Sequence, residues 1–263
     1  MVRKGIIVIF SIYIVLLLGF YLVQERIIFQ SKKLDKNFTY TFTKRFEEIN
    51  LRAKDSSTIN ALHFKVENPK GVLLYFHGNK GSLKRWGDMV SPYTDYNYDV
   101  FVMDYRGYGK SNGKRSEKAM YNDAQVAYDH LKITFKENDI VVYGRSMGAT
   151  FATFVASQNM PKQLILEAPF YSLVDAVNGN FPFLPFNTLL KYKFRSHELI
   201  SKVSSPTVIF HGDNDSLISI KSSKKLYEAS NMEITDFVTI KNGTHHNLTT
   251  FNIYKEKIKT LLN

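Results

Sequence analysis

The sequence contains no cysteine among its 263 residues. Disulfides, thiolate metal sites and a cysteine nucleophile are therefore excluded. The absence does not define a cellular compartment, because a secreted enzyme with a large core can fold without disulfides. An internal repeat of the solenoid kind is also lacking. The length is sufficient for one large α/β domain or for two small ones.

Acidic residues are scarce relative to basic ones, with 24 Asp and Glu against 35 Lys and Arg, which gives a formal charge of +11. The sequence has neither an arginine-rich helix nor an RNA-binding signature, so nucleic acid is not expected as a partner. A basic cluster follows the apolar N-terminus, at Arg26, Lys32, Lys33, Lys36, Lys44 and Arg45. These residues favour lipid headgroups over nucleic acid, and a solvated basic face is the simplest interpretation.

Charge is entirely absent from Gly5 to Val23, a run of apolar residues with the sequence GIIVIFSIYIVLLLGFYLV. At about 1.5 Å per residue this run spans a bilayer core of about 30 Å. A cleaved signal peptide would have a shorter apolar region and small residues at its cleavage site, and a core helix would show a polar face. Residues 1–25 are therefore predicted to be a single-pass membrane anchor. Basic residues on both sides leave the membrane face of the catalytic domain undefined.

The remaining chain divides into a polar, basic linker over residues 26–44 and one domain over residues 45–263. Phe46 to Ala53 and Ile59 to Val66 alternate as two antiparallel strands do, with a turn at Asp55-Ser56-Ser57. Apolar runs follow that resemble strands buried on both faces, and they lie at Val72–Phe76, Val100–Met103, Ile140–Tyr143, Gln163–Leu166, Thr207–Phe210 and Phe237–Ile240.

Candidate helices separate these runs, near residues 82–94, 117–135, 147–158, 220–230 and 248–261. The alternation predicts an α/β fold with a mostly parallel sheet flanked by helices. In such sheets the functional residues lie at the carboxyl ends of the strands. A serine, several acids and several histidines occur there, in separate loops.

Gly144-Arg145-Ser146-Met147-Gly148 is a G-x-S-x-G motif between a predicted strand and a predicted helix, which is the context of a nucleophile elbow. A serine hydroxyl needs a base, and the base needs an acid that fixes its tautomer. Asp215 follows the run Thr207–Phe210 and is the predicted acid, whereas Asp213 fits a turn former. The predicted base is in the last loop, where His245 and His246 are adjacent and cannot be distinguished by spacing.

A tetrahedral intermediate also needs two N–H donors for its oxyanion. We expect one from Met147, directly after the nucleophile, and the other from Asn79 in the loop His77-Gly78-Asn79-Lys80-Gly81. The alternative for His77-Gly78 is a strand end that caps the next helix. We see no cluster of histidines and carboxylates at ligand spacing, so neither a metal nor an organic cofactor is expected.

Five blocks in order make the sequence resemble the Bem46-type α/β hydrolases, within the group also described as serine aminopeptidase-like or "hydrolase 4" domains. They are Tyr75-Phe76-His77-Gly78-Asn79, Asp104-Tyr105-Arg106-Gly107-Tyr108-Gly109-Lys110-Ser111, Gly144-Arg145-Ser146-Met147-Gly148, His211-Gly212-Asp213-Asn214-Asp215 and His246-Asn247. The resemblance covers roughly residues 45–260 and implies an α/β-hydrolase fold with an eight-stranded type of sheet. In this family the histidine usually precedes an asparagine, which selects His246 as the base. The resemblance leaves Asp104 and Arg106 as a structural turn.

The segment from about residue 170 to 205 is expected to form a small cap over Ser146. Its aromatic residues suit an acyl chain or a membrane surface, or form the core of the cap itself. The function predicted is a membrane-anchored serine hydrolase that cleaves an acyl ester or thioester of a small substrate, a lipid or an acylated protein. The alternatives are an aminopeptidase, with Glu167 as a candidate acid for the amino terminus, and a catalytically silent hydrolase fold that binds a partner or a lipid. The oligomeric state is not defined by the sequence.

Overall fold

The computed structural model describes residues 2–178 and 184–263. An eight-stranded sheet with the order β10-β9-β8-β7-β4-β6-β3-β2 forms its centre. Strand β3 runs antiparallel to both of its neighbours, and the other pairings are parallel. The strands of this sheet are β2 (Phe46–Arg52), β3 (Thr58–Phe64), β4 (Val72–Phe76), β6 (Asp99–Met103), β7 (Ile140–Arg145), β8 (Gln163–Glu167), β9 (Thr207–Gly212) and β10 (Thr235–Ile240).

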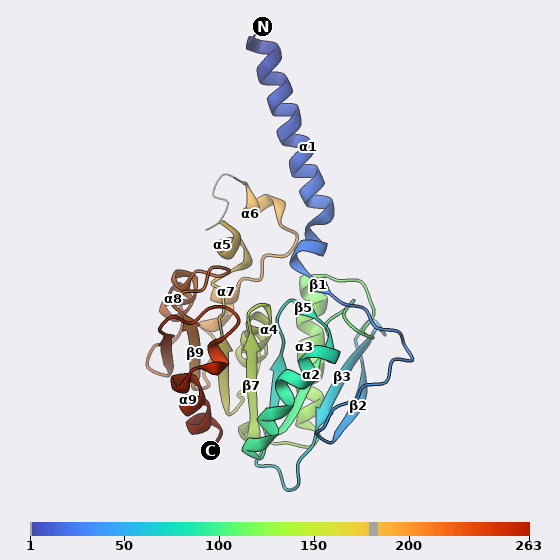
Figure 1. Ribbon diagram of the computed structural model, residues 1–263, viewed down its shortest axis with the longest axis vertical. Coiled ribbons are helices and arrows are strands. Elements are labelled where there is room, and N and C mark those ends of the chain that lie inside the picture. Colours follow the sequence, from blue (N-terminus) through green and yellow to red (C-terminus); the bar gives the residue numbers. More distant parts are fainter. Residues whose placement is uncertain (1, 179–183) are drawn as a thin grey trace.

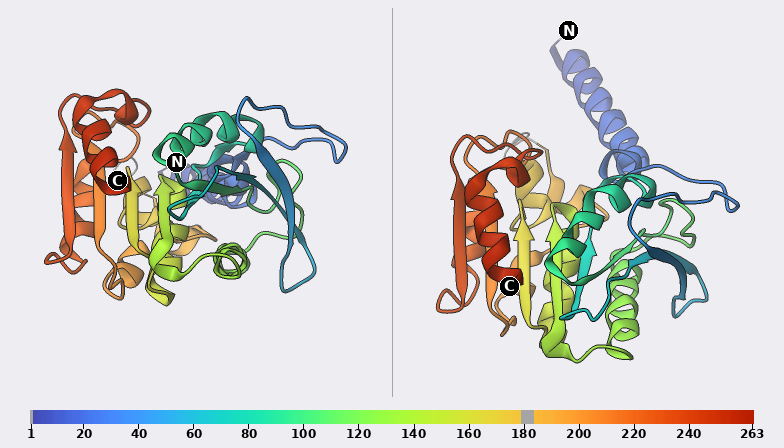
Figure 2. Two further views of the ribbon diagram at one scale, coloured as in Figure 1. Left: turned by 90° about the horizontal axis from the view of Figure 1, so that it is seen from below. Right: turned by 60° about the horizontal axis from the view of Figure 1, so that its bottom comes forward.

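Helices cover both faces of the sheet (Figures 1 and 2). One face packs against α3 (Glu117–Lys132), α4 (Met147–Gln158), α7 (Ser196–Ile200) and α8 (Ile220–Glu228). The other face packs against α2 (Leu83–Val90), η1 (Ser91–Tyr96), η3 (Leu248–Thr250) and α9 (Asn252–Leu262). A further short helix, η2 (Glu137–Asp139), precedes β7.

The central strands bury both of their faces, which explains why their sequences do not alternate. In β4, Leu74 and Phe76 pack in the cluster that contains α3 and α4, whereas Leu73 and Tyr75 pack in the cluster that contains α2 and α9. All five residues of β4 are buried. Apolar side chains are therefore required at every position, as in other sheets that are covered on both sides.

The α/β-hydrolase fold predicted from the sequence is confirmed, and the predicted strands and long helices lie within a few residues of the observed ones. The predicted helix over 82–94 is divided into α2 and η1, and Pro92 lies at the start of η1. Proline lacks the N–H that continues an α-helical ladder. The predicted helix over 147–158 coincides with α4.

The segment predicted to form the cap contains α5 (Leu173–Asn178), α6 (Phe186–Leu189) and α7. Part of its predicted aromatic segment, Phe181-Pro182-Phe183, lies outside the described residues. The apolar core of the cap includes Val174, Phe186 and Leu190, with Phe20 of the N-terminal helix packed against it.

Helix α1 (Val2–Ile28) projects from the domain and contacts it only at its carboxyl-terminal end (Figure 1). It is the one helix, within the residues described, that is long and apolar enough to cross a membrane, and none of the residues in its apolar window is buried. Gln24 is its buried residue. The side chain of Gln24 donates to Leu189 O at 3.1 Å and accepts from Lys191 N at 2.7 Å.

The segment that follows α1 is not the free linker that its polar composition predicts. Strand β1 (Gln30–Ser31) pairs in parallel with β5 (Lys80–Gly81). Phe29 and Tyr40 are 2% and 4% exposed, and both belong to the core of the domain. The few apolar side chains of this segment therefore attach it to the domain along its length.

Candidate active site

The nucleophile elbow connects β7 with α4, and it is defined by local geometry. Ser146 has φ 54° and ψ −120°, a conformation that costs a non-glycine residue free energy. Its N–H donates to Glu167 O on the neighbouring strand at 2.8 Å. The sheet thus holds the strained residue on one side, and α4 holds it on the other.

Two glycines make the turn possible. A Cβ on Gly148 would lie 2.0 Å from Phe76 O, and one on Gly144 would lie 2.5 Å from the Cα of Ala149. Both distances are to backbone atoms, which cannot move without displacing β4 or α4. The close approach of α4 to the sheet therefore requires glycine at both ends of the motif, as the sequence pattern predicts.

A continuous line of hydrogen bonds connects Ser146, His245 and Asp215. His245 Nε2 lies 3.0 Å from Ser146 Oγ. His245 Nδ1 lies 2.7 Å from Asp215 Oδ2. The serine and the imidazole are nearly buried, at 9% and 6% exposed. This arrangement allows proton transfer from the hydroxyl to Nε2, with the carboxylate stabilising the resulting imidazolium.

The structure places His245 beside Ser146, which contradicts the prediction of His246 for that position. A hydrogen bond from Arg145 Nη2 to His245 O, at 3.0 Å, fixes the backbone at this position. The His246 ring is exposed and lines the cavity outside Ser146. Partial burial, with the nearby His245 and Arg145, lowers the pKa of His246 and favours its neutral form. The asparagine that follows His246, Asn247, accepts from Thr244 N through its side chain and shapes the turn.

Asp215 is placed where the sequence predicts the acid, and its side chain is fully buried. Oδ1 accepts from the N–H groups of Leu217 and Ile218, both at 2.9 Å. Oδ2 also lies 3.3 Å from His211 Nε2. Burial alone would raise the pKa of Asp215, but the hydrogen bonds from His211 and His245 outweigh it and hold the pKa well below its usual range. The carboxylate is thus ionised at neutral pH.

Glu167, the candidate acid for an amino-terminal substrate group, is engaged elsewhere. It is 1% exposed and its Oε1 lies 3.2 Å from Arg145 Nε. Its Oε2 accepts from the hydroxyl of Tyr143. Glu167 does not line the cavity at Ser146. The acid that an aminopeptidase pocket would require is therefore not supplied by this residue.

The predicted oxyanion donors, Met147 and Asn79, both lie at this site. Met147 is the first residue of α4, whose initial N–H groups have no acceptor within the helix. Asn79 lines the same cavity as Ser146. The Asn79 carbonyl accepts from Tyr108 Oη at 2.7 Å, which fixes the peptide on that side.

The loop of Asn79 is attached to the segment that leaves α1. Asn79 Nδ2 donates to Ile28 O at 3.0 Å, and Lys32 N donates to Gly81 O at 2.8 Å. Between these bonds, β1 pairs with β5, which begins directly after Asn79. On the opposite side, Trp86 Nε1 donates to Lys80 O at 2.9 Å. The loop is therefore clamped between α2 and the end of α1.

A cavity of about 380 Å³ adjoins Ser146, within the size range of small-molecule sites. Its lining includes three cationic side chains, Lys80, Arg85 and Arg145, and no carboxylate. The other lining residues are Gln30, Gly78, Asn79, Trp86, Ser146, Leu217, His245 and His246. The charge of this cavity suits a neutral or anionic substrate better than a cationic one.

The cap aromatics within the described residues form packing contacts and do not line this cavity. Phe194 is 0% exposed and meets Phe151 of α4 at a centroid distance of 5.5 Å. Tyr192 meets Phe29 at 4.7 Å. Of the interpretations offered for these aromatics, the structure favours the core of the cap.

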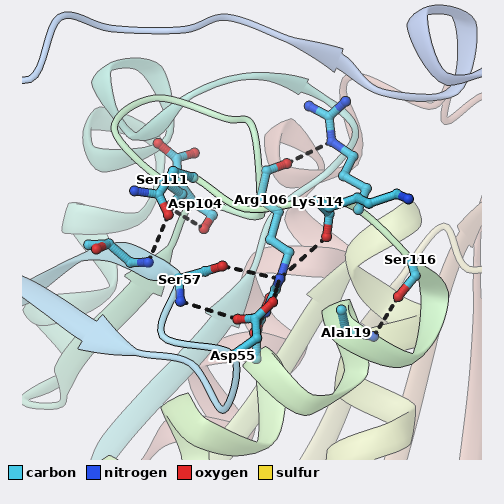
Figure 3. Close-up of polar contacts among 12 residues, drawn as sticks. Asp55, Ser57, Asp104, Arg106, Ser111, Lys114, Ser116 and Ala119 are labelled. Atoms are coloured by element: carbon cyan, nitrogen blue, oxygen red, sulfur yellow. Dashed lines mark hydrogen bonds and ion pairs between the residues drawn. The ribbon is translucent and has the colours of Figure 1, made fainter.

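The block around Asp104 and Arg106 has a structural role, as expected. Arg106 Nε donates to Asp123 Oδ2 at 2.6 Å, and the guanidinium also pairs with Asp55 (Figure 3). Asp104 is buried with His77, whose Nε2 lies 3.2 Å from Asp104 Oδ1. Burial raises the pKa of Asp104, and its bonds with His77 oppose that shift. These pairs support the turn after β6, whose Tyr108 hydroxyl donates to Asn79 O.

The fold and the elbow define an α/β hydrolase with a serine nucleophile elbow. The family Hydrolase_4, described as serine aminopeptidase, S33, matches residues 67–195. This chain belongs to that family of the α/β-hydrolase superfamily. The match covers the chain from β4 to β8, with the elbow, and extends to the residue before α7.

Curated relatives agree with this assignment. Protein bem46 of Schizosaccharomyces pombe is 32% identical over 67% of this chain and 63% of its own length. The lysophosphatidylserine lipase ABHD12 of Danio rerio is 29% identical over 63% of this chain and 48% of its own length. Alpha/beta hydrolase domain-containing protein 17C of Xenopus laevis is 31% identical over 73% of this chain and 61% of its own length. The chain thus spans about half to just under two thirds of these relatives.

Solved structures share the fold at low sequence identity. The Pyrococcus furiosus esterase Pf2001 has a TM-score of 0.70 at 18% identity, covering 88% of this chain and 98% of that one. Est1E from Butyrivibrio proteoclasticus, solved with ferulic acid, has a TM-score of 0.62 at 18% identity, covering 81% and 96%. At this identity the likeness supports the architecture alone.

Proposed function

We propose that this chain is a membrane-anchored serine hydrolase that cleaves an acyl ester or thioester through an acyl-enzyme. The observation that carries the proposal is the hydrogen-bonded line from Ser146 Oγ through His245 to the buried Asp215 carboxylate. The likeness to a lysophosphatidylserine lipase favours an ester bond over a peptide bond. The lack of a carboxylate in the lining of the cavity at Ser146 also argues against recognition of a free amino terminus.

In the proposed reaction Ser146 Oγ attacks the carbonyl carbon while His245 Nε2 takes its proton. The N–H groups of Met147 and Asn79 stabilise the negative oxygen of the tetrahedral intermediate. His245 then gives the proton to the leaving alcohol or thiol, which leaves an acyl group on Ser146. Water attacks the acyl-enzyme with His245 again as the base, and the free acid is released. Asp215 keeps the His245 ring in the productive tautomer throughout.

Helix α1 is proposed to remain in the mature protein as a membrane anchor. Its last turn supplies Gln24 to the cap and the Ile28 carbonyl to Asn79. Removal of residues up to the end of α1 would therefore break contacts within the folded domain, which is unlike the loss of a signal sequence. Its exposed apolar length suits a bilayer.

The test uses the full chain in detergent, wild type beside Ser146→Ala. Both are incubated with a fluorophosphonate probe and then with p-nitrophenyl esters from acetate to palmitate. We expect labelling and turnover in the wild type and neither in the variant. A folded wild type that is not labelled would sink the nucleophile assignment and favour a binding protein. Preference for acetate over longer chains would keep the triad but remove the acyl-lipid substrate.

A further inference from the structure

A second cavity, of about 550 Å³, lies at the base of α1. We call it the base cavity, and it is lined by Leu22, Glu25, Arg26, Phe29, Gln30, Ser31, Arg115 and Lys191. Gln30 also lines the cavity at Ser146. The two cavities therefore adjoin across one residue of β1, and the chain that leaves α1 forms a wall of each.

The position of the base cavity along α1 corresponds to the surface of a bilayer. The apolar run ends at Val23, and Gln30 follows seven positions later. At about 1.5 Å per residue this separation is about 10 Å. The polar layer on each side of a bilayer core is about 5–8 Å thick. A bilayer that holds the apolar run would thus have Leu22 at the edge of its core and its headgroups beside Glu25 and Arg26, with Gln30 just beyond them.

The cap is held at the same level. Phe186 of α6 meets Phe20 of α1 at a centroid distance of 5.8 Å, and Phe20 lies inside the apolar run. The hydrogen bonds between Gln24 and residues Leu189 and Lys191 fix this contact. Figure 1 shows α5 and α6 beside the lower part of α1. The domain cannot turn freely about the helix, so the base cavity keeps one orientation toward the membrane.

The charges along this path are predominantly positive. The base cavity has Arg26, Arg115 and Lys191 against the single acid Glu25, whose Oε1 accepts from Tyr192. The Lys191 ammonium lies over the Tyr21 ring, 4.6 Å from its centroid. The cavity at Ser146 adds Lys80 and Arg85, together with Arg145, which is paired with Glu167. Near a membrane such a set attracts anionic headgroups.

We propose that the base cavity is the entrance through which an acyl lipid passes from the bilayer to Ser146, and that its cations favour an anionic headgroup. The proposal rests on the function proposed above, since it requires both the anchor and the nucleophile. It goes beyond that function by specifying where the substrate comes from, which is the membrane that holds the enzyme. The headgroup would move along Arg26 and Lys191 while the acyl chain stays beside Leu22 and the cap.

The first experiment compares the rate of hydrolysis of a substrate in the membrane that holds the enzyme with the rate for the same substrate in a separate membrane. The full chain is reconstituted in phosphatidylcholine vesicles, and 4-methylumbelliferyl palmitate is placed in those vesicles or in enzyme-free ones. We expect turnover at least tenfold faster when enzyme and ester share a membrane. Equal rates would overturn the proposed entrance. Soluble 4-methylumbelliferyl acetate is measured in parallel, and failure to cleave it would instead count against the hydrolase function itself.

The second experiment tests the headgroup preference with Arg26→Gln/Lys191→Gln. The matched control is Lys255→Gln/Lys259→Gln, which removes the same charge from exposed positions of α9. Release of oleate is measured from lysophosphatidylglycerol and lysophosphatidylcholine placed in the enzyme's own vesicles. We expect the ratio of the two rates to fall at least fivefold in the first variant and to stay constant in the control. An unchanged ratio in both, with acetate cleavage intact, would overturn the role of the cations.

Discussion

The nucleophile elbow and the loop of Asn79, which is the proposed oxyanion loop, line the same cavity, yet they are built in different ways. The elbow is formed by five consecutive residues, and its constraints come from the strand before it and the helix after it. The oxyanion loop is short and is positioned by distant segments, notably Ile28 and Lys32. One half of the site is thus a local property of the chain, and the other half depends on the segment that leaves α1.

Substitution of the two adjacent histidines should give the largest change in kcat among the tests of this comparison. His245→Ala removes the base and should reduce kcat about 10⁴-fold or more. His246→Ala removes an exposed ring at the cavity rim and should change kcat by about threefold or less. Hydrolysis of p-nitrophenyl butyrate by the two variants, with fluorophosphonate labelling, measures the difference. A larger loss in His246→Ala would restore the prediction made from the family pattern.

The clamp on the oxyanion loop should give an intermediate effect. Lys32→Pro removes the N–H that bonds Gly81 O, whereas Lys32→Ala keeps that N–H and removes the same side chain. We expect kcat to fall about 10- to 100-fold in the proline variant, since a displaced oxyanion donor loses part of its effect.

The alanine variant should match the wild type, and KM for a small soluble ester should change little in both. Thermal unfolding confirms that each variant is folded. If Lys32→Pro is folded and keeps the wild-type kcat, β1 does not position the loop.

The smallest expected effect is on the pH dependence of stability. The pKa of Asp215 is lower in the folded protein than its value of about 3.9 in an unfolded chain. Its bonds with His211 and His245 therefore stabilise the fold above pH 4, and this contribution is lost as the pH falls through the folded pKa. Burial raises the pKa of Asp104 and of Asp123. Their protonated forms are therefore favoured in the folded protein, and the stability that this gives is lost as the pH rises.

Comparison of Asp215→Asn with the wild type isolates the contribution of the Asp215 carboxyl group to the pH dependence of stability. We expect the difference in free energy of unfolding to be larger at pH 6 than at pH 3, measured by urea denaturation of the full chain in detergent. The same difference at both pH values would show that the pKa of Asp215 is not depressed by folding.

The contrast between local and distant constraints also explains what the sequence could predict. The strands of the main sheet and the elbow have strong local patterns, so Ser146 and the surrounding elements were predictable. Asp215 followed from its place after a strand. His245 could not be separated from His246, because the choice depends on which way a turn faces, and that is set partly by Arg145 from another strand.

The segment after α1 was the other feature that sequence reasoning missed. Strand β1 has two residues, and its partner strand begins 50 positions later, so no periodicity could reveal the pairing. His211 was likewise noted only as part of a motif, although it supports Asp215. An isolated apolar residue in a basic stretch, such as Phe29, was the available signal that this segment packs against the domain.

The contact between Gln24 and Leu189 joins residues that are 165 positions apart. A ribosome makes the chain from the N-terminus, so α1 is complete long before the cap exists. If α1 is inserted in a bilayer, as proposed above, most of the domain must be synthesised before the carboxyl-terminal end of α1 finds its partners. Such long-range closure is slow relative to local helix formation. Assembly of the catalytic domain would thus finish at the membrane surface, with the cap among the last parts to dock.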